Sequence, residues 1–251
     1  MVDNNKCWVV DCGVLGYEEA LEFQKKLVLV RSKNLIPDVF LMLEHPATIT
    51  MGVKATEPML RVPRRVLNQR GIPVINVQRG GKVTLHSPGQ IVGYPIRAID
   101  LKDLDKHLTG MEDIMLKVLH SYNVNAIKSY EVDTDKKKRL PGAWIVHNKK
   151  ECKLGSIGVE MRSGVTMHGF ALNVNNDIAL FDLIDMCGFK NKYASSMAKI
   201  LDRPIAMPEL KQRLMGSFAE TFGYSVEQKS FLSLRDAINK VYDTRIKEKE
   251  E

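Results

Sequence analysis

The chain has 251 residues, with 37 Lys and Arg against 30 Asp and Glu, which gives a formal net charge of +7. Hydrophobic residues make up 44% and charged residues 27%, values that exclude a largely disordered chain. The four cysteines (7, 12, 152 and 187) contain no CxxC pair, which argues against a disulfide scaffold or a cysteine-ligated zinc site. The charge is compatible with nucleic acid and equally with an acidic protein partner.

The N-terminus, MVDNNKCWVVDCG, carries no basic stretch followed by an apolar one, so no secretory signal is predicted. Its acidic residues also argue against a transit peptide. No segment approaches the roughly 18 apolar residues of a membrane helix. Together with the unpaired cysteines, this predicts a cytoplasmic protein or the mature form of an imported one.

The first half of the chain alternates predicted strands and helices. The apolar run at 39–43 has strand length and predicts burial on both faces, and the spacing of apolar residues at 108–122 predicts an amphipathic helix. Between them, residues 79–96 hold four glycines and two prolines among short β-branched pieces. The remaining predictions are strands at 8–10 and 74–77 and helices at 17–31 and 63–71.

The second half begins with a charged run at 133–139, predicted as an exposed loop. Three successive strands with short turns follow, and then helices. We predict one domain over 1–251, of α/β class with a mixed α+β sheet and a helical C-terminal portion from about 203 to 251. A doubly wound nucleotide fold fits less well, because consecutive strands often lack a helix between them. The predicted strands are 143–146, 153–161 and 170–174, the helices are 208–222 and 233–242, and 245–251 is a frayed end.

The segment RGGKVTLHSPGQ (79–90) is a candidate binding loop. Its paired glycines let the backbone approach a ligand, and Arg79 is a candidate charged clamp. Thr84 and His86 alternate onto one face of a strand. A plain glycine-bearing hairpin is the alternative, and the segment has neither a GxGxxG nor a Walker pattern.

Cys187 and Lys153 are candidates for a reactive thiol and its cationic partner only if they meet in space. A cysteine is most often a buried small hydrophobe, but Gly188 beside Cys187 opens the backbone. A lysine near a thiol stabilises the thiolate and can move a proton. The local pattern around Lys153 favours a solvent-facing side chain, so the pairing stays open at this point.

The six histidines have neither HxH nor HExxH spacing, so no metal site is predicted. His168 is predicted in a turn between strands.

Five ordered segments resemble the octanoyl-ACP:protein octanoyltransferases of lipoate biosynthesis, also called lipoate–protein ligase B. They cover roughly residues 8–200, and an early HPATITMG (45–52) matches the family as well. Leu85, Ser87 and Met186 depart from the family pattern without removing a reacting group. The five segments are RGGKVTLHSPGQIVGYPI (79–96), PGAWI (141–145), KLGSIGV (153–159), GVTMHGFALNV (164–174) and DMCGF (185–189).

The resemblance implies the fold of the lipoate and biotin protein ligase catalytic domains. It also implies that Cys187 takes the octanoyl group as a thioester and that Lys153 lowers the thiol pKa. We expect no cofactor and no metal, and the oxyanion is expected near backbone N–H groups of 155–158. The residues implied to bind substrate are Arg79, Gly80, Gly81, Lys82, Val83, Thr84, Leu85, His86, Ser156, Ile157, Gly158, Gly169, Phe170 and Ala171.

The implied donor is octanoyl-acyl carrier protein. The implied acceptors are apo lipoyl domains of 2-oxoacid dehydrogenase complexes or the glycine cleavage H protein. Both partner classes are generally acidic, which suits the +7 charge. We expect a monomer with no nucleic-acid or membrane partner.

Three alternatives remain at this stage. An ATP-dependent lipoate or biotin ligase would use the same fold without needing the cysteine. An amidotransferase would move octanoyl between two lipoyl-type proteins by the same thioester chemistry. A silent binding or nucleic-acid module is less favoured, because only 136–139 clusters basic residues, without interleaved aromatics.

Overall fold

The apolar run at 39–43 becomes the central strand β2 (Asp38–Glu44) of a six-stranded sheet. The computed structural model describes residues 5–128, 140–185 and 192–245. In the sheet β2 pairs parallel to β1 and antiparallel to β6, which confirms a mixed sheet. The strand order is β10 (Gly155–Arg162), β11 (Val165–Asn173), β6 (Gln90–Ile96), β2, β1 (Lys6–Val14) and β13 (Ser225–Ser230).

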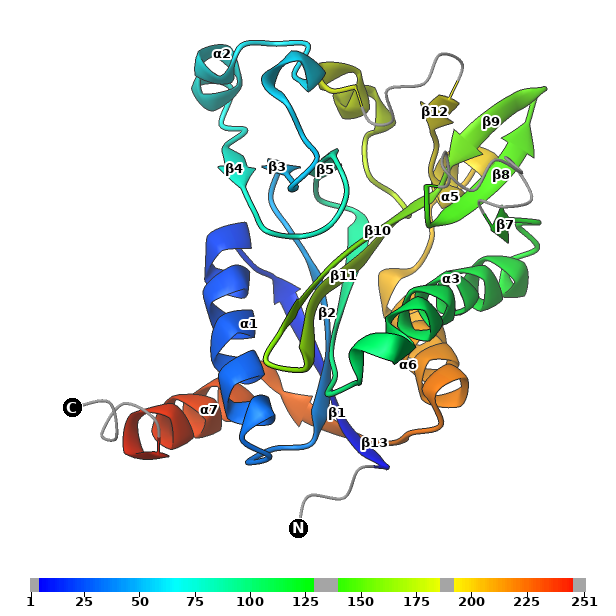
Figure 1. Cartoon of the computed structure of the whole chain (residues 1–251). Coiled ribbons are helices and arrows are strands. Elements are labelled where there is room, and N and C mark those ends of the chain that lie inside the picture. The colour runs from blue at the N-terminus through cyan, green and yellow to red at the C-terminus, as the bar shows by residue number, and fades with distance from the viewer. Residues whose placement is uncertain (1–4, 129–139, 186–191, 246–251) are drawn as a thin grey trace.

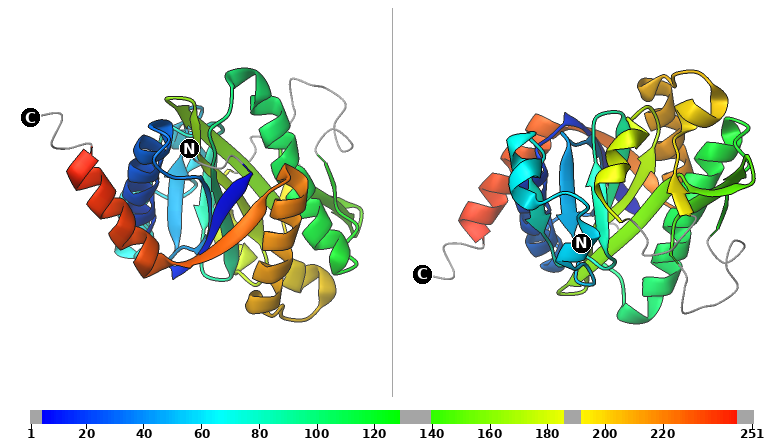
Figure 2. Two further views of the ribbon diagram at one scale, coloured as in Figure 1. Left: turned by 90° about the horizontal axis from the view of Figure 1, so that it is seen from below. Right: turned by 90° about the horizontal axis from the view of Figure 1, so that it is seen from above.

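Helices cover both faces of this sheet (Figures 1 and 2). On one face, Val39 and Leu41 of β2 share a core cluster with α1 (Tyr17–Ser32) and α7 (Phe231–Arg245). On the other, Phe40 and Met42 pack with α3 (Leu104–Ser121) and α6 (Met207–Phe222). The alternation follows from the two-residue period of a strand, and burial on both faces requires the continuous apolar run.

Two smaller sheets stand at one end of the main sheet, at the top of Figure 1. The first has the order β4 (Val74–Asn76), β3 (Thr48–Met51), β5 (Val83–His86), and the second β12 (Lys192–Ala194), β9 (Lys150–Lys153), β8 (Ala143–His147), β7 (Ile127–Lys128). The remaining helical pieces are η1 (Glu57–Met59), α2 (Arg64–Gln69), η2 (Leu101–Asp103), η4 (Ile178–Leu183) and α5 (Met197–Leu201).

Two local predictions were wrong. The strand predicted over 153–161 is two strands in different sheets, because Lys153 ends β9 and β10 begins at Gly155. His168 lies within β11, paired opposite Val159, and not in a turn. The C-terminal portion also contributes a strand, β13, parallel to β1. The charged loop at 133–139 and the end at 246–251 lie outside the described residues.

In the part of the chain that the structure describes, no helix has the length and apolar character needed to cross a membrane.

Candidate functional site

Segments from three distant parts of the chain meet at one small pocket. Along β10 and β11, Ser156 lies opposite Ala171 and Gly158 opposite Gly169, and Arg79 with β5 closes the pocket from the side. Its volume is about 40 Å³, room for about one water molecule. The lining residues are Tyr17, Arg79, Thr84, His86, Val92, Tyr94, Ser156, Ile157, Gly158, His168, Gly169, Phe170 and Ala171.

All three residues named in each of the 156–158 and 169–171 segments line this pocket, but only part of the 79–86 segment does. Arg79, Thr84 and His86 reach it. Val83 and Leu85 point to the other side of β5, into the core of the small sheet, as alternation along a strand requires. The remaining residues expected at the site, Gly80, Gly81 and Lys82, are not among the residues that line it in the described chain.

The paired glycines serve contact between segments of the chain. The N–H of Gly80 donates to the carbonyl of Val159 at 2.9 Å, so this group is not free to hold a ligand. A Cβ on Gly158 would stand 2.9 Å from the carbonyl oxygen of Gly80 and 3.0 Å from Cδ of Arg79. Glycine is therefore required at 158 so that the 79–81 segment can lie directly against β10.

Arg79 is a buried cation, 7% exposed. Its guanidinium donates to the backbone oxygen of Thr50 at 2.9 Å, to the hydroxyl of Thr50 at 2.8 Å and to the carbonyl of Gly80 at 3.0 Å. These acceptors are all neutral, and burial lowers the pKa of Arg79. The charge is thus held beside the pocket by dipoles alone, where an approaching partial negative charge would be stabilised.

A cluster of buried tyrosines and histidines at one end of the pocket was not predicted. His45 lies 2.8 Å from the hydroxyl of Tyr94 through Nε2 and 2.7 Å from the carbonyl of Leu15 through Nδ1, so Nδ1–H donates and Nε2 accepts. Burial lowers the pKa of His45 to about 4, which keeps it neutral. The rings of Tyr17 and His86 stack at 5.6 Å. Tyr17 was predicted only as an apolar position of a helix. His45, in contrast, lies in the HPATITMG segment (45–52) that matches the family pattern.

Lys153 is buried at the end of β9, with 8% of its surface exposed, so the solvent-facing interpretation was wrong. Its Nζ lies 5.0 Å from the ring of Trp144, which faces it on β8. A Cβ on Gly142 would come 3.0 Å from Cε of Lys153, so the chain passes close over the lysine. Lys153 stands two residues before β10, next to the Ser156–Ala171 end of the pocket.

Cys187 lies outside the described residues. The described chain resumes after it at β12, where Ala194 pairs with Lys153. The backbone N–H of Ser195 also donates to the carbonyl of Lys153 at 3.0 Å. The meeting of Cys187 and Lys153 therefore stays a prediction.

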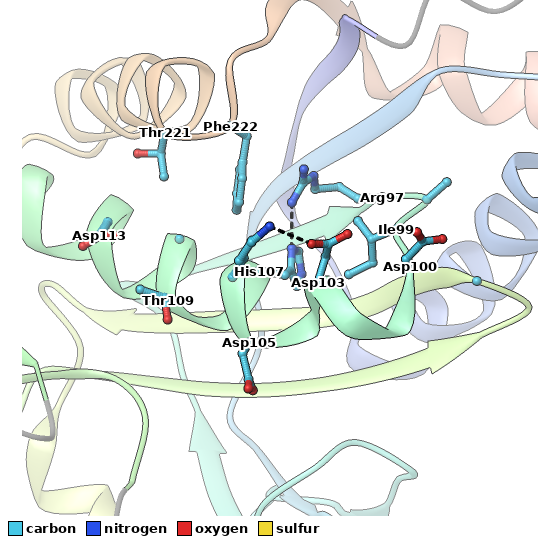
Figure 3. A pocket seen from close by; sticks show the side chains of 14 residues that line it. Arg97, Ile99, Asp100, Asp103, Asp105, His107, Thr109, Asp113, Thr221 and Phe222 are labelled. Carbon is cyan, nitrogen blue, oxygen red and sulfur yellow. Dashed lines mark hydrogen bonds and ion pairs between the residues drawn. The ribbon is translucent and has the colours of Figure 1, made fainter.

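A larger hollow of about 1030 Å³ lies elsewhere, between α3 and the end of α6 (Figure 3). Arg97 lines it, with its guanidinium carbon 3.8 Å from the ring of Phe222 and Nη1 donating to Nδ1 of His107 at 3.0 Å. None of the predicted site residues that the structure describes lines it. It therefore does not compete with the small pocket as the place of the predicted acyl chemistry.

The model of the lipoyl protein ligase A/B catalytic domain matches residues 16–219. The chain belongs to this family. An octanoyltransferase of Desulforamulus reducens is 32% identical over 222 residues, which cover 88% of this chain and 93% of that protein. An octanoyltransferase of Chloroflexus aurantiacus is 36% identical over 213 residues, 84% of this chain and 91% of that protein.

Solved structures share the fold at low identity. A chain in the structure of the bi-partite lipoate protein ligase and its E2 lipoyl domain from Thermoplasma acidophilum matches with a TM-score of 0.68 at 13% identity, over 94% of this chain and 91% of that chain. A lipoate-protein ligase A bound with ATP matches with a TM-score of 0.66 at 13% identity, over 96% and 95% of the two chains. The predicted fold and family are thereby confirmed.

Proposed function

We propose that this protein transfers an octanoyl group from octanoyl-acyl carrier protein, through a thioester on Cys187, to a lysine of an apo lipoyl domain. The family and its curated octanoyltransferase relatives support the transfer. The observation that carries the proposal is the burial of Lys153 at the end of a pocket lined by the 156–158 and 169–171 segments. A buried amine beside a small pocket suits proton handling next to an acyl group.

In the first step, the thiolate of Cys187 attacks the carbonyl carbon of the donor thioester. The new carbon–sulfur bond forms as the bond to the carrier's sulfur breaks, and the carrier thiolate takes the proton of the Lys153 ammonium. The products are S-octanoyl-Cys187, the free carrier thiol and neutral Lys153. Since a positive charge near a thiol stabilises its thiolate, Lys153 favours the reactive form of Cys187 before this step.

In the second step, the acceptor lysine attacks the carbonyl carbon of S-octanoyl-Cys187. A neutral amine is needed for attack, and neutral Lys153 accepts the proton that the amine loses. The amide bond forms, Cys187 leaves as the thiolate, and Lys153 is again an ammonium. Outward-facing backbone N–H groups within 155–158 are the proposed oxyanion donors, because β10 is an edge strand and every second N–H along it points away from β11.

The acyl chain occupies the small pocket in this proposal. Since its volume is about 40 Å³, lining side chains must move as the chain enters. Ile157 and Phe170 lie opposite each other midway along it, and we expect these two side chains to separate.

The proposed partners are acidic domains, attracted by the +7 charge, and the octanoyl acceptors are lipoyl domains of 2-oxoacid dehydrogenase complexes or the glycine cleavage H protein. We place the reaction in the cytoplasm, where free thiols such as Cys7, Cys12 and Cys152 persist. We expect the protein to act as a monomer.

Intact-mass spectrometry tests the proposal. Mixing the protein with octanoyl-acyl carrier protein is expected to add one octanoyl group, located on Cys187 by peptide mapping, and apo lipoyl domain is expected to remove it. Cys187→Ala should abolish both events, while Cys152→Ala serves as the matched control because it lies one residue from Lys153. Turnover by Cys187→Ala, or a transfer that requires ATP, would refute the proposal.

A further inference from the structure

We propose that His168, positioned by Gln24, forms the far end of the acyl pocket and limits the length of the acyl chain. This inference rests on the proposed octanoyl transfer and names the residue pair that selects the substrate.

The pairing of β10 with β11 gives the pocket a direction. Ser156 and Ala171 form the step nearest Lys153, and Val159 and His168 form the step farthest along. Three residue steps separate these pairs, a span of about 10 Å at the rise of a strand. An extended eight-carbon chain has a comparable length. An acyl group that starts near Lys153 and runs along this ladder therefore ends at His168.

The imidazole of His168 closes that end. It is 2% exposed, with Nδ1 3.5 Å from the hydroxyl of Tyr17 and Nε2 3.4 Å from the carboxylate of Glu160. The ring of Tyr94 stands edge-on to it at 6.3 Å. The side chains of Tyr17, Tyr94 and His168 all line the pocket, so a chain longer than the ladder meets a wall of rings.

The backbone of His168 is held in an unusual conformation. Its φ of +58° lies in the left-handed region, although the residue sits inside a strand and carries a Cβ. Its N–H donates to Oε1 of Gln24 on α1 at 2.7 Å, and Gln24 is only 1% exposed. Such strain persists only where surrounding contacts enforce it, and here the buried amide of Gln24 supplies such a contact. Gln24 is therefore a positioning residue that aims the imidazole.

The test compares octanoyl-, decanoyl- and dodecanoyl-acyl carrier protein as donors to Cys187, measured by intact mass over time. His168→Gly removes the imidazole and accepts the left-handed conformation without strain. We expect it to raise the dodecanoyl-to-octanoyl rate ratio about tenfold or more, the scale of discrimination by pocket size. Ser163→Gly is the matched control: Ser163 also has a positive φ, +48°, but lies exposed in the turn between β10 and β11, and its ratio should equal that of the wild type.

Gln24 is tested by a double-mutant cycle. Gln24→Met keeps the length of the side chain and removes the acceptor, so it should shift the ratio in the same direction as His168→Gly. In the His168→Gly background it should shift the ratio no further, because no imidazole is left to position. Additive shifts would overturn the positioning role.

The outcomes separate the two proposals. A wild type that accepts octanoyl on Cys187, together with an unchanged ratio in His168→Gly, overturns the inference and leaves the proposed function standing. A wild type that accepts none of the three acyl groups overturns both. If thermal melting shows that His168→Gly is unfolded, His168→Asn replaces it, since asparagine tolerates positive φ, and the same ratio decides.

Discussion

Two buried polar clusters, each built around arginine, differ in how they compensate charge. The first consists of Arg31, Asp38, Arg97 and Tyr224, and we call it the C-terminal cluster because it fixes Tyr224 immediately before the C-terminal strand β13. In it, Arg31 donates to Asp38 at 2.7 Å, and both side chains are less than a tenth exposed. The other carboxylate oxygen of Asp38 accepts from the hydroxyl of Tyr224, which in turn accepts from Nε of Arg97 at 2.8 Å. In the pocket cluster, Arg79 donates to neutral oxygens of Thr50 and Gly80, and the neutral hydroxyl of Tyr17 is a further hydrogen-bond partner.

The difference indicates distinct roles. The C-terminal cluster joins the residue before β13 to the start of β2 and to the chain after β6, and it contains a buried carboxylate, Asp38, that pairs directly with Arg31. The pocket cluster keeps an uncompensated cation, a neutral His45 and a strained His168, features that cost stability and are typical of binding sites. We therefore expect substitutions that break the Arg31–Asp38 pair to lower the free energy of unfolding more than substitution of Arg79 does.

The largest effect is expected from Asp38→Ala. The substitution leaves Arg31 buried without its carboxylate and removes the acceptor of the Ala98 N–H, at 3.0 Å, and of the Tyr224 hydroxyl. Breaking a buried pair from one side should lower the free energy of unfolding by about 3–5 kcal/mol. Urea unfolding followed by circular dichroism measures this. A loss below about 1 kcal/mol would show that the cluster does not hold the C-terminal portion in place.

The next effect concerns pH at the pocket cluster. Burial lowers the pKa of His45 from 6.5 to about 4, so the unfolded chain binds this proton first as pH falls. The contribution of neutral His45 to stability is complete above pH 6.5 and is lost as pH falls toward 4. Each pH unit in that window costs up to about 1.4 kcal/mol. His45→Gln should therefore lose about 2 kcal/mol less than the wild type between pH 6.5 and 5.

Urea midpoints measured from pH 8 to pH 5 check this prediction. His107 on α3, which lies beside Arg97, offers the parallel case, because burial and Arg97 lower its pKa to about 3. His107→Gln should flatten the same window. Parallel pH curves for the wild type and His45→Gln would mean that the pKa of His45 is the same in the folded and the unfolded protein, and would contradict the prediction.

A smaller effect on stability is expected at Arg79. Arg79→Met removes a buried cation that no described carboxylate compensates, so the free energy of unfolding should fall by only about 1 kcal/mol. Arg31→Met, which strands Asp38, should cost about 3 kcal/mol. Octanoyl transfer should show the reverse order, with Arg79→Met reduced roughly 10²-fold, because the 79–81 segment loses its anchor on β3. Equal stability losses in the two variants would remove the distinction between the clusters.

The parts of the fold that the sequence predicted are those decided by local periodicity. The helices at 17–31 and 108–122 and the strand at 39–43 match α1, α3 and β2, because their apolar spacing alone selects the element. β13 was missed because its sequence, SVEQKS, has few apolar residues, and pairing with β1 at the sheet edge is what makes it a strand. Such an element depends on a partner more than 200 residues away in sequence.

The candidate site, like the fold, was predicted only where a local sequence pattern decides the structure. The motif segments 156–158 and 169–171 were predicted to line one pocket, and they do lie together. The burial of Lys153 was missed because it depends on the break at Leu154, where the chain passes from one sheet to another. The conformation of His168 depends on Gln24, 144 residues earlier. Side-chain exposure and strain at a site are set by such long-range contacts, which no local pattern encodes.

The smallest change in the free energy of unfolding is expected for an ion pair at the surface. Glu22 and Lys25 on α1 form an ion pair at 2.6 Å, slightly shorter than the 2.7 Å of Arg31–Asp38, but their side chains are 66% and 39% exposed. Since water screens an exposed pair, Glu22→Ala should change the free energy of unfolding by at most about 0.5 kcal/mol in the same urea assay. The Glu22–Lys25 and Arg31–Asp38 pairs thus have nearly the same distance between their charged atoms but differ in how far their side chains are buried. If Glu22→Ala cost as much as Asp38→Ala, distance would decide the energy of these pairs, and the contrast between compensated and uncompensated buried charge would lose its physical basis.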